Sequence, residues 1–159
     1  MMNRPEPAAQ SRTQSRTMMI YGLAMIVSLI GLGDSIYLTV QHLSGRSVKC
    51  TVTNGCSAVL SSSYATLAGI PTASFGRLAY FAAFSLATLA VFGYTWARTG
   101  LALLVVPMLA MSLWLVSVQA FKLHAFCEFC LLSAAMTLIL TLLVVAARLL
   151  SAAKPTKFK

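Results

Sequence analysis

Charged residues are scarce in this sequence. They make up 9% of its 159 residues, and only three of them are acidic. A water-soluble domain carries roughly 25% charged residues, so the composition excludes an ordinary soluble protein. The net charge of +9 does not indicate nucleic-acid binding. The basic residues lie between and outside the apolar runs, where they mark membrane orientation and contact acidic lipid head groups.

The sequence also lacks the motifs of common redox cofactors. It has no Cys-x-x-Cys-His haem attachment, no glycine-rich dinucleotide loop and no metal-ligand cluster. Cysteine occurs only as two pairs, Cys50/Cys56 and Cys127/Cys130. Paired cysteines can accept electrons by thiol–disulfide exchange. Electrons accepted in this way would need an acceptor other than these cofactors, and a lipid-soluble quinone fits a site among membrane helices.

Four apolar runs dominate what is present, and each is near the ~20 residues needed to cross a bilayer. They cover residues 18–40, 74–96, 101–121 and 127–147. We predict an all-α integral membrane protein, a four-transmembrane-helix bundle over residues 18–147. Residues 1–17 are expected to be a disordered basic tail and residues 148–159 a second basic tail. Tight turns are expected at residues 98–100 and 122–126.

The one long connection, residues 41–73, is polar by comparison and contains the turn signal Asn54-Gly55. Residues 57–68 predict a short helix over the mouth of the bundle, stopped by Gly69 and Pro71. Long loops of this kind are usually functional or disordered.

The distribution of Lys and Arg predicts the orientation. Eight lie in the two tails and at Arg98, and four lie on the opposite side. The positive-inside rule places both termini in the cytoplasm. All four cysteines then face the outer compartment, where disulfides persist.

Cys127 and Cys130 begin the fourth apolar run, about one helical turn apart, so both sulfurs share one helix face. Unpaired N–H groups and the helix dipole in the first turn favour a thiolate and a low pKa. Two small core cysteines are the plainer interpretation of the same spacing.

Cys50 and Cys56 have five residues between them, whereas structural zinc sites usually separate paired cysteines by two to four. Zinc and two structural disulfides both stay open as alternatives. A short-loop disulfide on an outer loop is suited to opening and reclosing. The favoured hypothesis is a relay in which the loop pair collects electrons and the helix pair receives them by thiol–disulfide exchange.

Several motifs together resemble the vitamin K epoxide reductase family in its bacterial, DsbB-like form. They are the loop cysteines, the run Cys56-Ser57-Ala58-Val59-Leu60-Ser61-Ser62, Phe75-Gly76 at the second span and Cys127-x-x-Cys130 at the fourth. The resemblance covers about residues 18–147.

This resemblance implies a thiol:quinone oxidoreductase that supports disulfide bond formation. The enzyme would reoxidise a separate thioredoxin-fold, DsbA-like partner outside the cytoplasm and reduce ubiquinone or a menaquinone of the vitamin K type. It would be a multi-pass protein of the bacterial inner membrane. The alternatives are a quinone-epoxide reductase, and a non-enzymatic scaffold or metal-binding protein with structural cysteines.

The resemblance also implies roles for single residues. Cys127 would exchange with Cys50, and Cys56 would form the mixed disulfide with the partner. Cys130 would face the quinone, and Ser62 would hydrogen-bond near the active cysteines.

Other positions carry hypotheses on substrate binding. Animal members of the family have a tyrosine at the position of Ala134 and an asparagine near that of Thr72, which favours plain quinone over epoxide. Four aromatic residues either line a quinone pocket or belong to the interfacial belt: Phe75, Tyr80, Phe126 and Phe129.

The remaining polar residues near the cysteines each have two interpretations. Asp34 either tunes a thiolate, with Arg77 as a candidate partner, or is hydrated at the interface. His42 and His124 either pass protons to the quinone or contact head groups. Glu128 is expected to be a solvated acid in the first turn of its helix.

Overall fold

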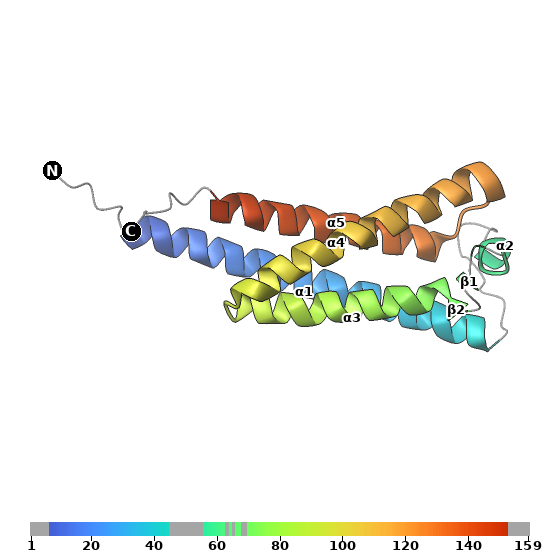
Figure 1. Cartoon of the computed structure of the whole chain (residues 1–159), viewed down its shortest axis with the longest axis horizontal. Helices are drawn as coiled ribbons and strands as arrows, with labels where there is room; N and C mark the ends of the chain where they lie inside the picture. The colour runs from blue at the N-terminus through green and yellow to red at the C-terminus, as the bar shows by residue number, and fades with distance from the viewer. Residues whose placement is uncertain (1–6, 45–55, 63, 65, 68–69, 153–159) are drawn as a thin grey trace.

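The computed structural model describes residues 7–44, 56–62, 64, 66–67 and 70–152. Four long helices lie side by side (Figure 1): α1 (Pro7–Leu43), α3 (Thr72–Val91), α4 (Thr95–Val118) and α5 (Glu128–Ala152). Each is long and apolar enough to cross a membrane, the third span including the π-helix η2 (Gln119–Leu123). The predicted all-α four-helix membrane fold is confirmed.

The short elements gather at one end of the bundle, opposite the start of α1 and the end of α5 (Figure 1). They are α2 (Cys56–Leu60), β1 (Thr66–Leu67) and β2 (Ile70–Pro71). The strands pair antiparallel, Thr66 with Pro71 and Leu67 with Ile70. The predicted short helix exists but ends at Leu60. Ser62 Oγ donates to the Val59 carbonyl at 2.6 Å, and such side-chain bonds compete with helix continuation.

The turn between the second and third spans is not where the sequence predicted it. It falls at Gly93, whose φ is 96°, and residues 98–100 lie inside α4. The Gly93 N–H donates to the Ala90 carbonyl and the Tyr94 N–H to the Leu89 carbonyl. This Schellman arrangement ends a helix with a left-handed residue, which glycine adopts without steric cost. Arg98, Thr99 and Gly100 do not adopt a left-handed backbone angle, and they continue the helix α4.

The tails also differ from the prediction where the structure describes them. The helix α1 begins at Pro7 rather than near residue 18, and α5 continues to Ala152. Proline is favoured at the first helical position. Residues that follow it, such as Ala8, Ala9 and Gln10, are good helix formers. Extending an existing membrane helix needs no new nucleation, so the basic segment joins α1. Residues 1–6 and 153–159 lie outside the described part of the chain.

Small residues allow the helices to approach closely. Ala83, Ala87 and Ala90 form one fully buried stripe on α3, and Ala97 on α4 is equally buried. Small interface residues of this kind are typical of packed membrane helices.

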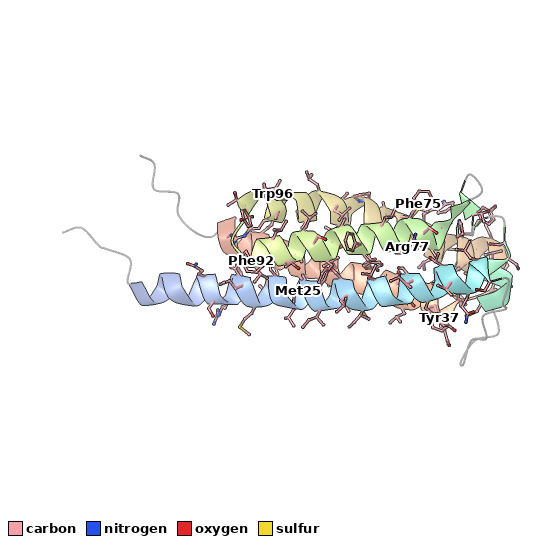
Figure 2. The ribbon with its side chains drawn as sticks, turned by 90° about the horizontal axis from the view of Figure 1, so that it is seen from below. Met25, Tyr37, Phe75, Arg77, Phe92 and Trp96 are labelled. Atoms are coloured by element: carbon pink, nitrogen blue, oxygen red, sulfur yellow. The ribbon has the colours of Figure 1, made fainter. Side chains whose placement is uncertain are left out.

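The outward surface carries many large apolar side chains (Figure 2). Aromatic residues mark both ends of the bundle, with Phe92 and Trp96 near one end and Tyr37 and Phe75 toward the other. Lipid solvates such a surface, and aromatic residues favour its two interfaces.

Candidate redox site

The site is built at the connection between α4 and α5. The helix α4 continues into η2, which ends at His124 with a left-handed φ of 45°. The chain then reaches Cys127, one residue before α5 begins. The Leu131 N–H donates to the Cys127 carbonyl at 3.0 Å. Cys127 therefore occupies the N-cap position of α5, one residue outside the helix that the sequence predicted to include it.

Gln119 holds this connection in place and was missed by the sequence analysis. Its Oε1 accepts a hydrogen bond from the Cys127 N–H at 2.9 Å, and its side chain is 2% exposed. The signal was present as one amide at the end of an otherwise apolar run. An amide in hydrocarbon needs an internal partner, and here the partner is the backbone N–H of Cys127.

Cys127 and Cys130 are both free thiols, and Cys127 is fully buried. A hydrogen bond from the Cys130 thiol lowers the pKa of Cys127, although burial opposes it. The N–H groups of Cys130 and Phe129 also donate to the Cys127 sulfur and lower its pKa. A sulfur at an N-cap thus replaces the usual capping oxygen. The arrangement agrees with the expected low-pKa cysteine.

Cys56 lies against the same turn. It is disulfide-bonded and 1% exposed. It shares a buried cluster with Val59 and Cys127, and Leu123 and Phe129 pack against that cluster. Cys50, predicted as the second loop cysteine, lies outside the described residues. Cys56 therefore packs close to Cys127 from the side of the loop.

A cavity of about 410 Å³ opens beside Cys130. Its lining is mostly apolar, and it includes the predicted residues Ser62, Phe75, Tyr80 and Cys130. Its polar lining side chains are Ser35, Ser62, Tyr64, Thr72, Tyr80, Ser112, Gln119, Cys130, Ser133 and Thr137.

Two of the predicted aromatic residues do not line this cavity. Phe129 packs its ring on Tyr37, with centroids 5.2 Å apart. Phe126 is 44% exposed at the end of the bundle. The cause is helical rotation, because α5 turns Cys130 toward the cavity and Phe129 toward α1.

Tyr80 joins two walls of the cavity. Its ring is 1% exposed, and its hydroxyl donates to the Ser133 carbonyl at 2.7 Å. The same hydroxyl lies 2.7 Å from the Thr137 hydroxyl. Since Cys130, Ser133 and Thr137 share one face of α5, this bonding fixes α3 against the helix that carries the redox cysteine.

Thr72 and Ala134 also line the cavity. Thr72 donates its hydroxyl to the Tyr64 carbonyl at 3.3 Å. The family resemblance drew attention to these two positions in the sequence, and both belong to the wall of the cavity.

The other polar candidates have different outcomes. Asp34 is 9% exposed, and neither of its carboxylate oxygens has a hydrogen-bond partner among the described residues. Within the described residues Asp34 does not pair with Arg77, since the Arg77 side chain is exposed. His42 lies in α1, but its side chain is outside the described set. Glu128 occupies the first turn of α5 as predicted.

Comparison with protein families bears on this arrangement directly. Residues 23–145 match the sequence model of the vitamin K epoxide reductase family. This match includes all of α3 and α4, most of α1 and α5, and all four cysteines. The chain belongs to the vitamin K epoxide reductase family. The resemblance seen in the sequence is thereby confirmed at the level of the family.

Membership defines the general class of activity. The vitamin K epoxide reductase family comprises membrane oxidoreductases that act on thiols and disulfides and use quinones. With four helices able to span a bilayer, the protein is a multi-pass membrane oxidoreductase.

Proposed function

We propose that this protein is a thiol:quinone oxidoreductase that oxidises a separate thioredoxin-fold dithiol protein and reduces a membrane quinone. The observation that carries the proposal is Cys130, which lines the apolar cavity while its thiol hydrogen-bonds to Cys127. One sulfur thus reaches the loop side and the other reaches the cavity.

The cavity suits a quinone as the electron-accepting substrate. Small-molecule sites are concave, mostly apolar and roughly 300–1,000 Å³ in volume. The cavity measures about 410 Å³, and its walls include Phe75, Met108 and Leu104. These side chains match an aromatic ring with an isoprenoid tail. The few hydroxyl groups of the lining provide polar contacts for ring oxygens.

The position of Cys56 favours a particular order of exchange. A soluble partner cannot reach a sulfur that is 1% exposed unless α2 moves. Cys56 already packs in one cluster with Cys127, and thiol–disulfide exchange requires direct contact of the sulfurs. We therefore assign Cys56 as the donor to Cys127 and Cys50 as the sulfur that meets the partner. This reverses the order that the family resemblance implied.

The chemistry balances as three linked two-electron steps. The partner dithiol reduces the loop disulfide, and the loop dithiol reduces the Cys127–Cys130 disulfide. The reduced helix pair then re-forms its disulfide while the quinone becomes quinol. Each step breaks one S–S bond or reduces one quinone for each S–S bond formed.

Plain quinone is preferred over quinone epoxide as the substrate. Thr72 and Ala134 form part of the cavity wall, at the positions where animal enzymes carry asparagine and tyrosine. Ala134 has no hydroxyl that could donate to an epoxide oxygen.

The proposed setting follows from charge and topology. The basic residues of both termini favour a cytoplasmic location for them. The cysteine end would then face the periplasm or another extracytoplasmic space of a bacterial cell, where dithiol partners are oxidised.

The decisive experiment is anaerobic mixing of the reduced protein with a short-chain quinone, while free thiols and quinone absorbance are followed. We expect two thiols to be lost per quinone reduced in the wild type and none in Cys130→Ala. Cys56→Ala is the matched control, because it retains the helix pair and should still reduce quinone. It should nevertheless fail to oxidise a dithiol partner.

Loss of quinone reduction in Cys56→Ala would contradict the assigned division between the two pairs. No thiol loss in the wild type would overturn the function itself. Structural cysteines of a scaffold or metal-binding protein would then explain the four sulfurs.

A further inference from the structure

Asp34 is a buried carboxyl group with no hydrogen-bond partner in the described part of the chain. It lies on α1 within a membrane-spanning segment and is 9% exposed. Neither carboxylate oxygen has a hydrogen-bond partner among the described residues. An unpaired polar group in such a place costs roughly 1–3 kcal/mol and more when charged. Ionisable groups inside membrane segments mark ion or proton pathways.

The neighbours of Asp34 on α1 show which way this face points. Gly31, one turn earlier, lies so close to Tyr80 that an added Cβ would be 2.3 Å from its ring. Tyr37, one turn later, packs on Phe129 with centroids 5.2 Å apart. Residues three apart share a helix face. Asp34 therefore lies between the buried ring of Tyr80 and the first turn of α5, where the redox cysteines begin.

Electrostatics connects the same groups. The negative charge of the Asp34 carboxylate interacts electrostatically with the Cys127 and Cys130 sulfurs. It also acts on the Tyr80 hydroxyl. Two negative charges in a low-dielectric interior repel each other, so a proton on Asp34 favours the thiolate form of Cys127.

The proposed reaction has a proton requirement that the cysteines alone do not meet. Reduction of a quinone to a quinol takes up two electrons and two protons. The helix pair supplies both electrons. The Cys130 thiol lowers the pKa of Cys127 by donating to its sulfur, and whenever Cys127 is a thiolate the pair holds a single proton, on Cys130. A second proton must come from another group or from water.

We propose that Asp34 stores this second proton and exchanges it with the Cys127–Cys130 pair during each turnover. The inference rests on the proposed quinone reduction. It assigns to Asp34 a role in proton transfer through the cysteines rather than contact with the quinone, since Asp34 does not line the cavity.

The proton count closes over the cycle. In the reduced state Asp34 is protonated, Cys127 is a thiolate and Cys130 is a thiol. Quinone reduction takes the protons of Asp34 and Cys130, forms the Cys127–Cys130 disulfide and leaves Asp34 as a carboxylate. When the loop dithiol next reduces that disulfide, its two protons return to Asp34 and Cys130. The net charge of the three groups is −1 throughout, so no charge moves into the membrane.

Other titratable groups that face this region are less suited to the role. The Tyr80 hydroxyl on α3 is engaged with Ser133 and Thr137. Cys56 is disulfide-bonded. Glu128 lies at the partly exposed end of α5, where water can reach it. Tyr37 on α1 is 41% exposed and faces Phe129.

The test is single-turnover quinone reduction by the full-length reduced protein across a range of pH. Wild type should show a rate that is nearly independent of pH around neutrality. In Asp34→Asn the second proton must come from water, so the rate should fall about tenfold per pH unit and by ~10²-fold at neutral pH. Asp34→Glu should restore the flat profile. Ser28→Ala, a buried α1 substitution away from the site, should match wild type.

A second measurement obtains its main signal from the wild-type protein, and the variant serves only to assign that signal. Infrared difference spectra of wild type before and after quinone addition should show loss of one protonated carboxyl C=O stretch. That signal should be absent in Asp34→Asn. If wild type reduces quinone but Asp34→Asn keeps its rate and pH profile, and no carboxyl signal changes, the proton-storage role is wrong. If wild type does not reduce quinone at all, the proposed function fails first.

Discussion

At the scale of the residue, the site depends on the position of one sulfur at a helix start. Cys127 caps α5 and accepts hydrogen bonds from the Cys130 thiol and from two backbone N–H groups. Gln119 holds the Cys127 N–H from the opposite side. Hydrogen-bond donors lower the pKa of Cys127, and no Arg or Lys of the described residues contributes to that shift.

Cys130→Ala should raise the pKa of Cys127. The substitution removes the strongest of the interactions that lower it, while burial continues to raise it. Thiolate absorbance in the ultraviolet should therefore develop at a higher pH in the variant than in the wild type. The loop disulfide stays oxidised during the titration, so it does not contribute.

Cys127→Ala is the control for this titration, because it removes the thiol whose ionisation at the lower pH is being followed. An unchanged titration curve in Cys130→Ala would show that the backbone donors alone stabilise the thiolate.

At the scale of the element, the contact of α1 with α3 positions the cavity wall. The Tyr80 ring of α3 lies directly on Gly31 of α1, while its hydroxyl bonds to Ser133 and Thr137 of α5. One side chain thus joins three helices. A glycine at position 31 is needed for this close approach rather than for any unusual backbone angle.

Gly31→Ala should destabilise the protein and disturb the cavity. The added Cβ would lie 2.3 Å from a Tyr80 ring that is 1% exposed. The ring cannot move without breaking its hydrogen bonds to α5. Overpacking of this kind costs about 1–3 kcal/mol, which should lower the thermal unfolding temperature in detergent and slow quinone reduction.

Gly33→Ala is the matched control on the same helix. Apart from the nearby backbone of α1 itself, no atom of the described residues lies within 4 Å of the added Cβ, so this variant should be neutral or slightly stabilised by helix propensity. Equal destabilisation by both substitutions would mean that the Tyr80 contact is not the cause.

At the scale of the whole molecule, the two ends of the bundle are chemically different. One end carries α2 and the described cysteines (Figure 1). At the other end the Arg98 guanidinium lies 5.5 Å from the centre of the Tyr21 ring, and Arg148 donates to the Arg98 carbonyl. A concentration of basic residues at one end of a membrane bundle favours one orientation in the membrane.

The predicted orientation can be measured with single cysteines in a background without the native four. Ser44→Cys and Ser151→Cys are introduced at exposed positions near opposite ends of the bundle. In intact bacterial cells a membrane-impermeant thiol reagent should label Ser44→Cys and should label Ser151→Cys only after lysis. The reverse pattern would place the redox cysteines in the cytoplasm and contradict the oxidising role.

The sequence by itself determined the four membrane helices and the family, and it placed a cysteine pair at the start of the fourth helix. The length of the apolar runs, the scarcity of charge and the spacing of the cysteines are local properties of the sequence. They do not depend on how the helices are arranged. It placed the second turn wrongly, at residues 98–100, because a Schellman end depends on backbone geometry at Gly93 more than on composition.

Only the tertiary structure decided which residues meet. It placed Cys130 on the cavity and Phe129 away from it, brought Cys56 to Cys127, and set Gln119 under the redox cysteine. It also buried Asp34 of α1 without a hydrogen-bond partner among the described residues. These relations depend on how each helix is rotated about its axis. That rotation is set by contacts between distant residues, such as Gly31 with Tyr80, which no local pattern encodes.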